Sequence, residues 1–173
     1  MLARVRAGET AAYAELVTTH APVARRLAVL SGAGPDADDV VQEAFVKAYR
    51  SLSSFRDGAD FRPWLLRIVV NETRNLHRGR SRRSDRELRV VREEARVATG
   101  PDPAEVAVSE ERREALLDAI RALPEELRLV ITCRYLLELS EAETADSLGI
   151  PAGTVKSRLH RGLARLREGL PDA

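Results

Sequence analysis

The sequence contains a single cysteine among its 173 residues, Cys133, so no disulfide can form within one chain and no thiolate metal site is available. Cys133 lies in an apolar stretch, which predicts a small core residue. The three histidines, His20, His77 and His160, are far apart and none has a metal-ligand spacing. We therefore expect no metal site and no cofactor.

Long apolar runs are also missing. No segment reaches membrane-spanning length and no signal peptide is recognisable, so the sequence predicts a cytoplasmic protein without membrane insertion. Strand-like alternation never lasts more than a few residues, and alanine, leucine, arginine and glutamate dominate. These features predict an all-α fold, with room for one ordinary domain or two small ones.

The net charge of +1 hides a strong segregation of charge. Between Arg74 and Arg92 there are eight arginines and two acids, a local net charge of +6, whereas the acidic run from Asp36 to Glu43 is answered only by Lys47. Such asymmetry indicates separate surfaces for a polyanion and for a basic partner. For either run alone, a solvated helix face is an equally good interpretation.

Apolar periodicity divides the chain into two halves. Residues 13–30 carry one helical stripe, with a possible bend at Pro22, and further helices are predicted at about 36–51 and 61–78. Residues 79–108 have no continuous apolar face and read as a flexible linker, partly helical at most. A separate core pattern then follows. We therefore predict two small helical domains, 1–78 and 109–173, joined by this linker.

A helix-turn-helix is predicted in the second domain. Ser140 and Glu143 have the spacing of a capping box, which places a helix start at Ser140. Gly149 can end that helix in a left-handed conformation, and Pro151 suits the first turn of the next one. Two short helices around a tight glycine turn are typical of this motif.

The helix after Pro151 has two different faces. Its apolar residues fall on one side: Val155, Leu159, Leu163 and Leu166. Its polar stripe is formed and flanked by Thr154, Lys156, Ser157, Arg158, His160 and Arg161. Arginine can read guanine edges in the major groove, and serine and threonine contact phosphates or bases, so this face predicts DNA binding.

Five of the seven aromatic residues lie within twenty positions: Phe45, Tyr49, Phe55, Phe61 and Trp64. Aromatic rings beside a basic helix suit single-stranded nucleic acid, because each stacked base contributes about 1–3 kcal/mol. Phe45 and Tyr49 have core spacing and are expected to pack inside. Phe61 and Trp64 lie next to a polar loop and are the better candidates for an exposed role.

Three segments together resemble bacterial sigma factors of the extracytoplasmic-function branch, in the expected order and covering nearly the whole chain. They are "PDADDVVQEAFVKAYR", "FRDGADFRPWLLRIVVNETRNLHR" and "ALPEELRLVITCRYLLELSEAETADSLGIPAGTVKSRLHRGLARLRE". The resemblance implies a region 2 helical bundle at 1–78, a linker at 79–108 that crosses core polymerase, and a region 4 helix-turn-helix at 109–173. It also implies core RNA polymerase and promoter DNA as partners, and an anti-sigma factor as a probable one.

The resemblance assigns three sets of site residues. The polymerase-docking set matches Asp36, Asp38, Asp39, Val40 and Gln42. The set for the −10 element, including the loop that captures a flipped base, matches Phe55, Arg56, Asp57, Gly58, Phe61, Trp64, Asn71, Arg74 and Asn75. The set for the −35 element matches Thr154, Lys156, Ser157, Arg158, His160 and Arg161. No catalytic residue is implied, and the expected protein is not an enzyme.

The chain departs from the family pattern in the first helix of the helix-turn-helix. Thr144 and Ser147 stand where aliphatic residues are usual, and Glu141 replaces a frequent aromatic. Buried hydroxyls weaken a small core unless they bond back to the helix. We therefore expect the second domain to be the less stable half in isolation.

Two other functions are compatible with parts of the sequence. A helix-turn-helix regulator acting without polymerase would bind duplex DNA tightly by itself, but it leaves the first half unexplained. A metal-dependent enzyme could use Asp36, Asp39 and Glu43 as ligands for a hard cation. No second acidic cluster or general base completes such a site.

Overall fold

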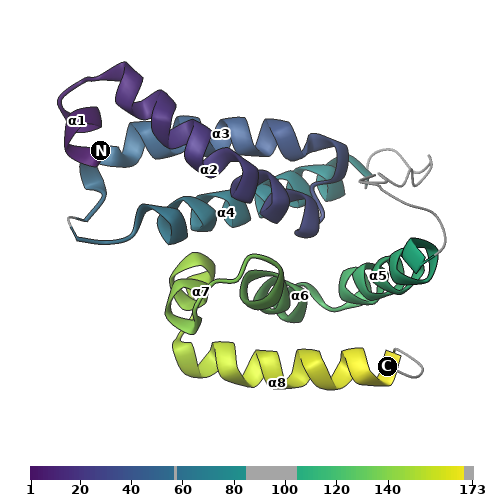
Figure 1. Ribbon diagram of the computed structural model, residues 1–173. Coiled ribbons are helices and arrows are strands. Elements are labelled where there is room, and N and C mark those ends of the chain that lie inside the picture. Colours follow the sequence, from purple (N-terminus) through teal and green to yellow (C-terminus); the bar gives the residue numbers. More distant parts are fainter. Residues whose placement is uncertain (57, 85–104, 170–173) are drawn as a thin grey trace.

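The structure is a computed structural model that describes residues 1–56, 58–84 and 105–169. All regular structure within these residues is helical, which confirms the all-α prediction. The helices of the two halves lie in two layers, one above the other in the view of Figure 1.

The first half is a bundle of three long helices preceded by a short one. The helices are α1 (Leu2–Arg6), α2 (Thr10–Leu30), α3 (Ala37–Ser51) and α4 (Phe61–Ser84), with single 3₁₀ turns at Gly34–Asp36 and Leu52–Ser54. α2, α3 and α4 each pack against the other two. The predicted helix of residues 13–30 runs through Pro22 as one element.

The apolar stripes of these helices meet in one core. Leu27 of α2 and Leu65, Leu66 and Val69 of α4 are completely buried. Each such side chain stabilises the fold by about 1.5–3 kcal/mol relative to exposure. Tyr49 is an exception to the predicted core pattern, because its side chain is half exposed; its ring lies in an edge-to-face arrangement with Tyr13, with the ring centroids 4.8 Å apart.

α4 is longer than the sequence pattern predicts. It continues to Ser84 instead of ending near Arg78, so its last turns lie in the segment predicted to be a linker. Arginine is a good helix former, and the loss of an apolar face therefore does not end the helix. The rest of that segment up to residue 104 lies outside the described residues.

The second half contains four helices: α5 (Glu105–Ala122), α6 (Glu125–Ile131), α7 (Glu141–Leu148) and α8 (Ala152–Gly169). Pro124 precedes α6, as predicted. A π-helical segment, Thr132–Leu136, follows α6 and was not predicted. The amide of Leu137 donates to the carbonyl of Thr132 at 3.0 Å, and the wider turn brings both Leu137 and Leu139 into the core.

The two halves are in direct contact, because α4 packs against α7. A guanidinium nitrogen of Arg62 donates to the carbonyl of Leu137 at 2.9 Å, and Nε of Arg74 lies 2.8 Å from a carboxylate oxygen of Glu125. The two predicted helical units are therefore present, but they form one packed body in this structure.

Candidate nucleic-acid interface

The turn of the predicted helix-turn-helix has the expected geometry. The Ser140 side chain accepts from the amide of Glu143 at 3.1 Å, and the Glu143 carboxylate accepts from the amide of Ser140 at 2.7 Å. These bonds form a complete capping box at the start of α7 and hold the pKa of Glu143 below its usual value. Gly149 ends α7 with φ of 64°, in the left-handed region that favours glycine.

A second constraint acts on Gly149. A Cβ atom at this position would lie 2.9 Å from a guanidinium nitrogen of Arg67 on α4. Gly149 therefore combines a left-handed turn with close packing against the other half of the chain.

The two faces of α8 separate as predicted. Val155, Leu159 and Leu166 are buried, and Leu163 is partly buried against the core. On the opposite side Lys156, Ser157, His160 and Arg161 are exposed, while Thr154 and Arg158 are half-buried. The exposed polar stripe runs over the first three turns of the helix, beside the tight turn.

Acidic side chains of neighbouring helices lie against this stripe. Glu126 of α6 pairs with Arg158 at 2.9 Å and approaches Arg161 at 3.8 Å. Glu141 of α7 lies 3.6 Å from the Lys156 ammonium. No local signal in the sequence pairs these residues: Glu126 is not among the predicted site residues, and Glu141 was predicted only as a departure from the family pattern.

Thr144 and Ser147 of α7 are completely buried, and neither hydroxyl has a hydrogen-bond partner among the described residues. Among the described residues, neither hydroxyl donates to a backbone carbonyl of its own helix, the hydrogen bond that would offset its burial. This geometry supports the expectation of a weaker second half, which stays a prediction.

The aromatic residues of the predicted −10 loop form a compact cluster. Phe55, Phe61 and Trp64 have ring centroids 4.9 to 6.1 Å apart, and His20 lies 5.2 Å from Phe61. Burial, reinforced by the nearby Arg62 charge, lowers the pKa of His20.

Only one of these three rings is open to solvent. Trp64 is half-buried, whereas Phe55 and Phe61 are 5% and 7% exposed. The expectation that Phe61 is exposed was wrong, because Phe61 begins α4 and packs between its aromatic neighbours. Arg56 and Gly58 of the same loop are exposed, and Asp57 lies outside the described residues.

The α4 residues assigned to the −10 element are accessible to different extents. Asn71 and Asn75 are exposed. Arg74 is half-buried and paired with Glu125, so its guanidinium is engaged by the second half of the chain. Asn75 donates to Glu72 at 3.2 Å and accepts from Arg78 at 2.7 Å.

The acidic run at the start of α3 provides an accessible carboxylate surface. Asp38, Asp39 and Gln42 are exposed, and Asp38 pairs with Arg25 at 2.7 Å; Asp36 is half-buried and pairs with Arg80. Val40 is only 6% exposed and packs in the bundle core, so its side chain is not part of that surface.

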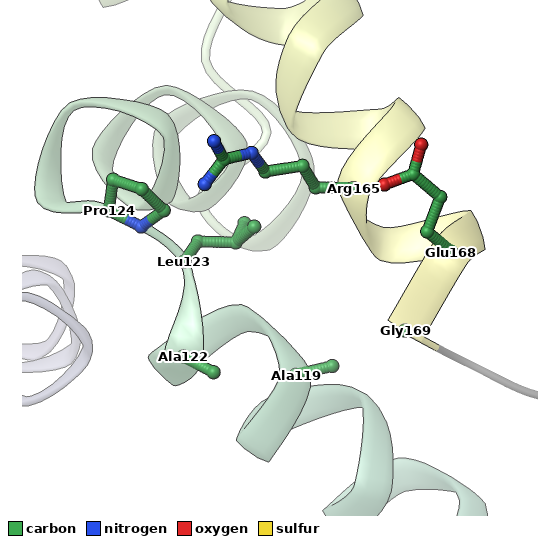
Figure 2. A pocket seen from close by; sticks show the side chains of 7 residues that line it. All are labelled: Ala119, Ala122, Leu123, Pro124, Arg165, Glu168 and Gly169. Carbon is green, nitrogen blue, oxygen red and sulfur yellow. The ribbon is translucent and has the colours of Figure 1, made fainter.

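An open groove lies at the far end of the second half, where α5, the start of α6 and the end of α8 meet (Figure 2). It is lined by Ala119, Ala122, Leu123, Pro124, Arg165, Glu168 and Gly169. Its only ionisable side chains are Arg165 and Glu168.

The alternative of a metal-dependent enzyme gains no support from the described residues. They contain no group of three or more His, Cys, Asp or Glu side chains able to hold a metal ion, so Asp36, Asp39 and Glu43 do not converge on one point. Among the same residues, no helix combines the length and apolarity needed to cross a membrane.

Two family models match the chain, one in each half. Sigma-70 region 2 matches residues 16–83, and Sigma-70, region 4 matches residues 113–166. The ECF RNA polymerase sigma-E factor of Escherichia coli K12 is 36% identical over 93% of this chain and 87% of its own length. The chain belongs to the extracytoplasmic-function (ECF) sigma factors.

Further relatives agree with this assignment. The ECF RNA polymerase sigma factor SigW of Bacillus subtilis is 35% identical over 98% of this chain and 94% of its own. The structure of CnrH in complex with the cytosolic domain of CnrY superposes with a TM-score of 0.69 at 30% identity, covering 96% of this chain and 92% of that one. The sigma factor RpoE, solved with the anti-sigma factor NepR from Bartonella quintana, has the same fold, with a TM-score of 0.75 at 24% identity over 91% and 95% of the two chains.

The matches explain both halves of the molecule. Region 2 comprises α2, α3 and α4, and region 4 comprises most of α5 together with α6, α7 and α8. This ECF sigma factor is an alternative sigma factor of transcription initiation and a DNA-binding regulator. A helix-turn-helix regulator without polymerase is not favoured, because that function leaves region 2 without a role.

Proposed function

We propose that this sigma factor directs core RNA polymerase to promoters by reading the −35 element with α8. The observation that carries the proposal is the exposed stripe of Lys156, Ser157, His160 and Arg161 on a helix held by the capping box and Gly149. A helix that follows a tight turn can enter the major groove, and each good side chain–base pair contributes about 1–3 kcal/mol of discrimination.

We propose that region 2 binds the −10 element through the loop of residues 55–61 and the outer face of α4. Moving a base out of the stack costs a few kcal/mol, so a preformed pocket is needed. The packed aromatic rings support the loop, and Trp64, which is only half-buried, is the ring of the cluster that is open to solvent. Asn71, Arg74 and Asn75 would meet the upstream part of the element.

Core polymerase would dock on the start of α3. Asp38, Asp39 and Gln42 present exposed acceptors to a basic partner surface, and Asp36 lies at its edge. Val40 would act indirectly, by packing the helix against the bundle. The charge of this surface favours encounter with a basic helix and makes the association sensitive to salt.

The same proposal gives this sigma factor no catalytic chemistry, because phosphodiester synthesis belongs to the polymerase. It acts where the chromosome is transcribed, in the bacterial cytoplasm. An anti-sigma factor is a further proposed partner, supported by the structure of CnrH, which is 30% identical to this chain and was solved in complex with the cytosolic domain of CnrY.

The first experiment is gel filtration of the purified protein with bacterial core RNA polymerase, followed by transcription from a promoter library. We expect co-elution and transcription from a restricted set of sequences. A folded protein that does not co-elute, yet binds duplex DNA tightly alone, would instead support the regulator that acts without polymerase.

A further inference from the structure

The charged residues of α8 differ in exposure. The side chains of Lys156 and Arg161 are 68% and 56% exposed, whereas that of Arg158 is 22% exposed. At about 100° per residue, Ser157 and Arg161 lie at the centre of the open stripe and Arg158 lies on its flank toward α6. Arg158 is therefore the basic residue of the stripe with the least access to a DNA groove.

A close helix crossing explains why Arg158 lies against α6. A Cβ atom at Gly162 would lie 3.0 Å from Cγ1 of Ile131 and 3.7 Å from Cβ of Leu127. The missing side chain at Gly162 lets α8 approach α6 at this point. Glu126, the neighbour of Leu127 in the first turn of α6, is thereby within reach of the α8 arginines.

One carboxylate lies between two guanidinium groups. Oε2 of Glu126 is 2.9 Å from Nη2 of Arg158, and Oε1 is 3.8 Å from Nη1 of Arg161. Nε of Arg158 is buried and has no hydrogen-bond partner among the described residues. Packing and charge therefore both restrain Arg158, while the carboxylate offsets the repulsion between the two arginines.

We propose that Glu126 is a positioning residue for recognition of the −35 element. It holds Arg158 against α6 and fixes the place of the Arg161 guanidinium, so that Arg161 and Ser157 meet the base edges in a preordered geometry. A long side chain that is ordered before binding loses less freedom on the DNA. The inference rests on the proposed reading of the −35 element by α8.

A different role for Glu126 gives a different signature. A carboxylate that only competes with phosphate weakens binding to every sequence, because phosphate contacts carry no base information. Removing such a competitor would raise affinity uniformly. A positioning residue instead changes the preference between bases, and its removal lowers the ratio of preferred to altered sequences.

The test uses polymerase holoenzyme and promoter fragments with a randomised −35 region, sequenced before and after binding. Arg161→Ala first identifies the base pairs that Arg161 reads. At those base pairs we expect Glu126→Gln to lower the preference for the wild-type base about tenfold, and Arg158→Ala to have the same effect. The variant that carries both substitutions should lose no more preference than either alone. Glu126→Asp keeps the charge and is expected to restore part of the preference.

Glu114→Gln is the matched control, because Glu114 is exposed on α5 and has no ion pair among the described residues. It is expected to retain the wild-type preference. Thermal unfolding of each variant separates a loss of fold from a loss of positioning.

Three results would overturn the inference. Glu126→Gln could leave the base preference unchanged, or change affinity equally on all sequences. Alternatively, Arg158→Ala could abolish preference at a base pair that Arg161→Ala leaves intact, which would make Arg158 a reader itself. A wild-type holoenzyme with no preference in the −35 region would refute the proposed function before any variant is compared.

Discussion

Reversing the charge of Glu125 should weaken the contact between regions 2 and 4. The side chains of Arg74 and Glu125 are 39% and 47% exposed, and such a pair contributes about 0.2–1 kcal/mol in solvent. Glu125→Arg replaces this attraction by a repulsion of similar size. The total change of about 1 kcal/mol shifts the ratio of closed molecules, with the two regions in contact, to open molecules, with the regions apart, about fivefold.

Energy transfer between dyes on the two regions measures this shift. Ala11 on α2 and Arg167 on α8 are exposed and can be replaced by cysteine. The native Cys133 can stay in place, because burial raises the pKa of its thiol to about 12 and the reactive thiolate is scarce. We expect lower transfer in Glu125→Arg, with a difference that shrinks as the salt concentration approaches about 1 M.

The control reverses another exposed acid of region 4, Glu114, which has no ion pair among the described residues. Equal changes in both variants would mean that net charge, rather than the Arg74 contact, governs closure. Unchanged transfer in a folded Glu125→Arg variant would refute the contribution assigned to the pair.

Three further predictions concern the cap, the core and the polymerase surface. Ser140→Ala should destabilise region 4 by about 1 kcal/mol in urea unfolding. The pKa of Glu143 is lower in the folded protein than in the unfolded chain, so this carboxylate stabilises the fold at high pH, and that stability is lost as the pH falls through its folded-state pKa. Ser140→Ala should therefore also reduce the pH dependence of the free energy of unfolding. Thr144→Val and Ser147→Ala should each stabilise by about 1 kcal/mol, since each removes a buried hydroxyl without a partner. Asp39→Arg should reduce affinity for core polymerase in a binding titration while leaving the fold intact, as judged by a cooperative unfolding curve.

Each of these has a matched control. Ser53→Ala removes an exposed hydroxyl outside any cap and should not change stability. Thr18→Val changes an exposed threonine and should not stabilise the protein. Glu168→Arg reverses an acid far from α3 and should leave polymerase affinity intact. If Thr144→Val or Ser147→Ala instead destabilised the protein, the hydroxyl that it removes would have a hydrogen-bond partner in solution.

Local chemistry made part of the site predictable. The capping box at Ser140 and the left-handed Gly149 depend on residues a few positions apart, so their pattern is visible in the sequence. The buried side of α8 follows from the same periodicity. The family models and relatives then confirm the resemblance that these motifs first indicated.

Contacts between distant residues could not be predicted in this way. Arg74 and Glu125 are both ordinary helix-surface residues, and only the packing of α4 against the second half brings them together. The burial of Phe61 depends likewise on rings contributed by other segments. The π-helical turn after α6 depends on which leucines the core accepts, a property of the assembled domain.

The acids that pair with the basic residues of the proposed DNA sites fall into two classes, those paired across the contact between the regions and those paired within region 4. Glu125 lies in region 4 and its partner Arg74 in region 2, so any separation of the regions frees Arg74 before DNA competes for it. Glu126 and Glu141 belong to region 4 itself and move with α8. Under the proposed function their charge would stay beside α8 when DNA binds and would offset part of the attraction of α8 for phosphate. If α4 and α8 bind the −10 and −35 elements as proposed, opening of the molecule would change the electrostatics of −10 binding, whereas −35 recognition would keep its acidic neighbours and rely more on base contacts.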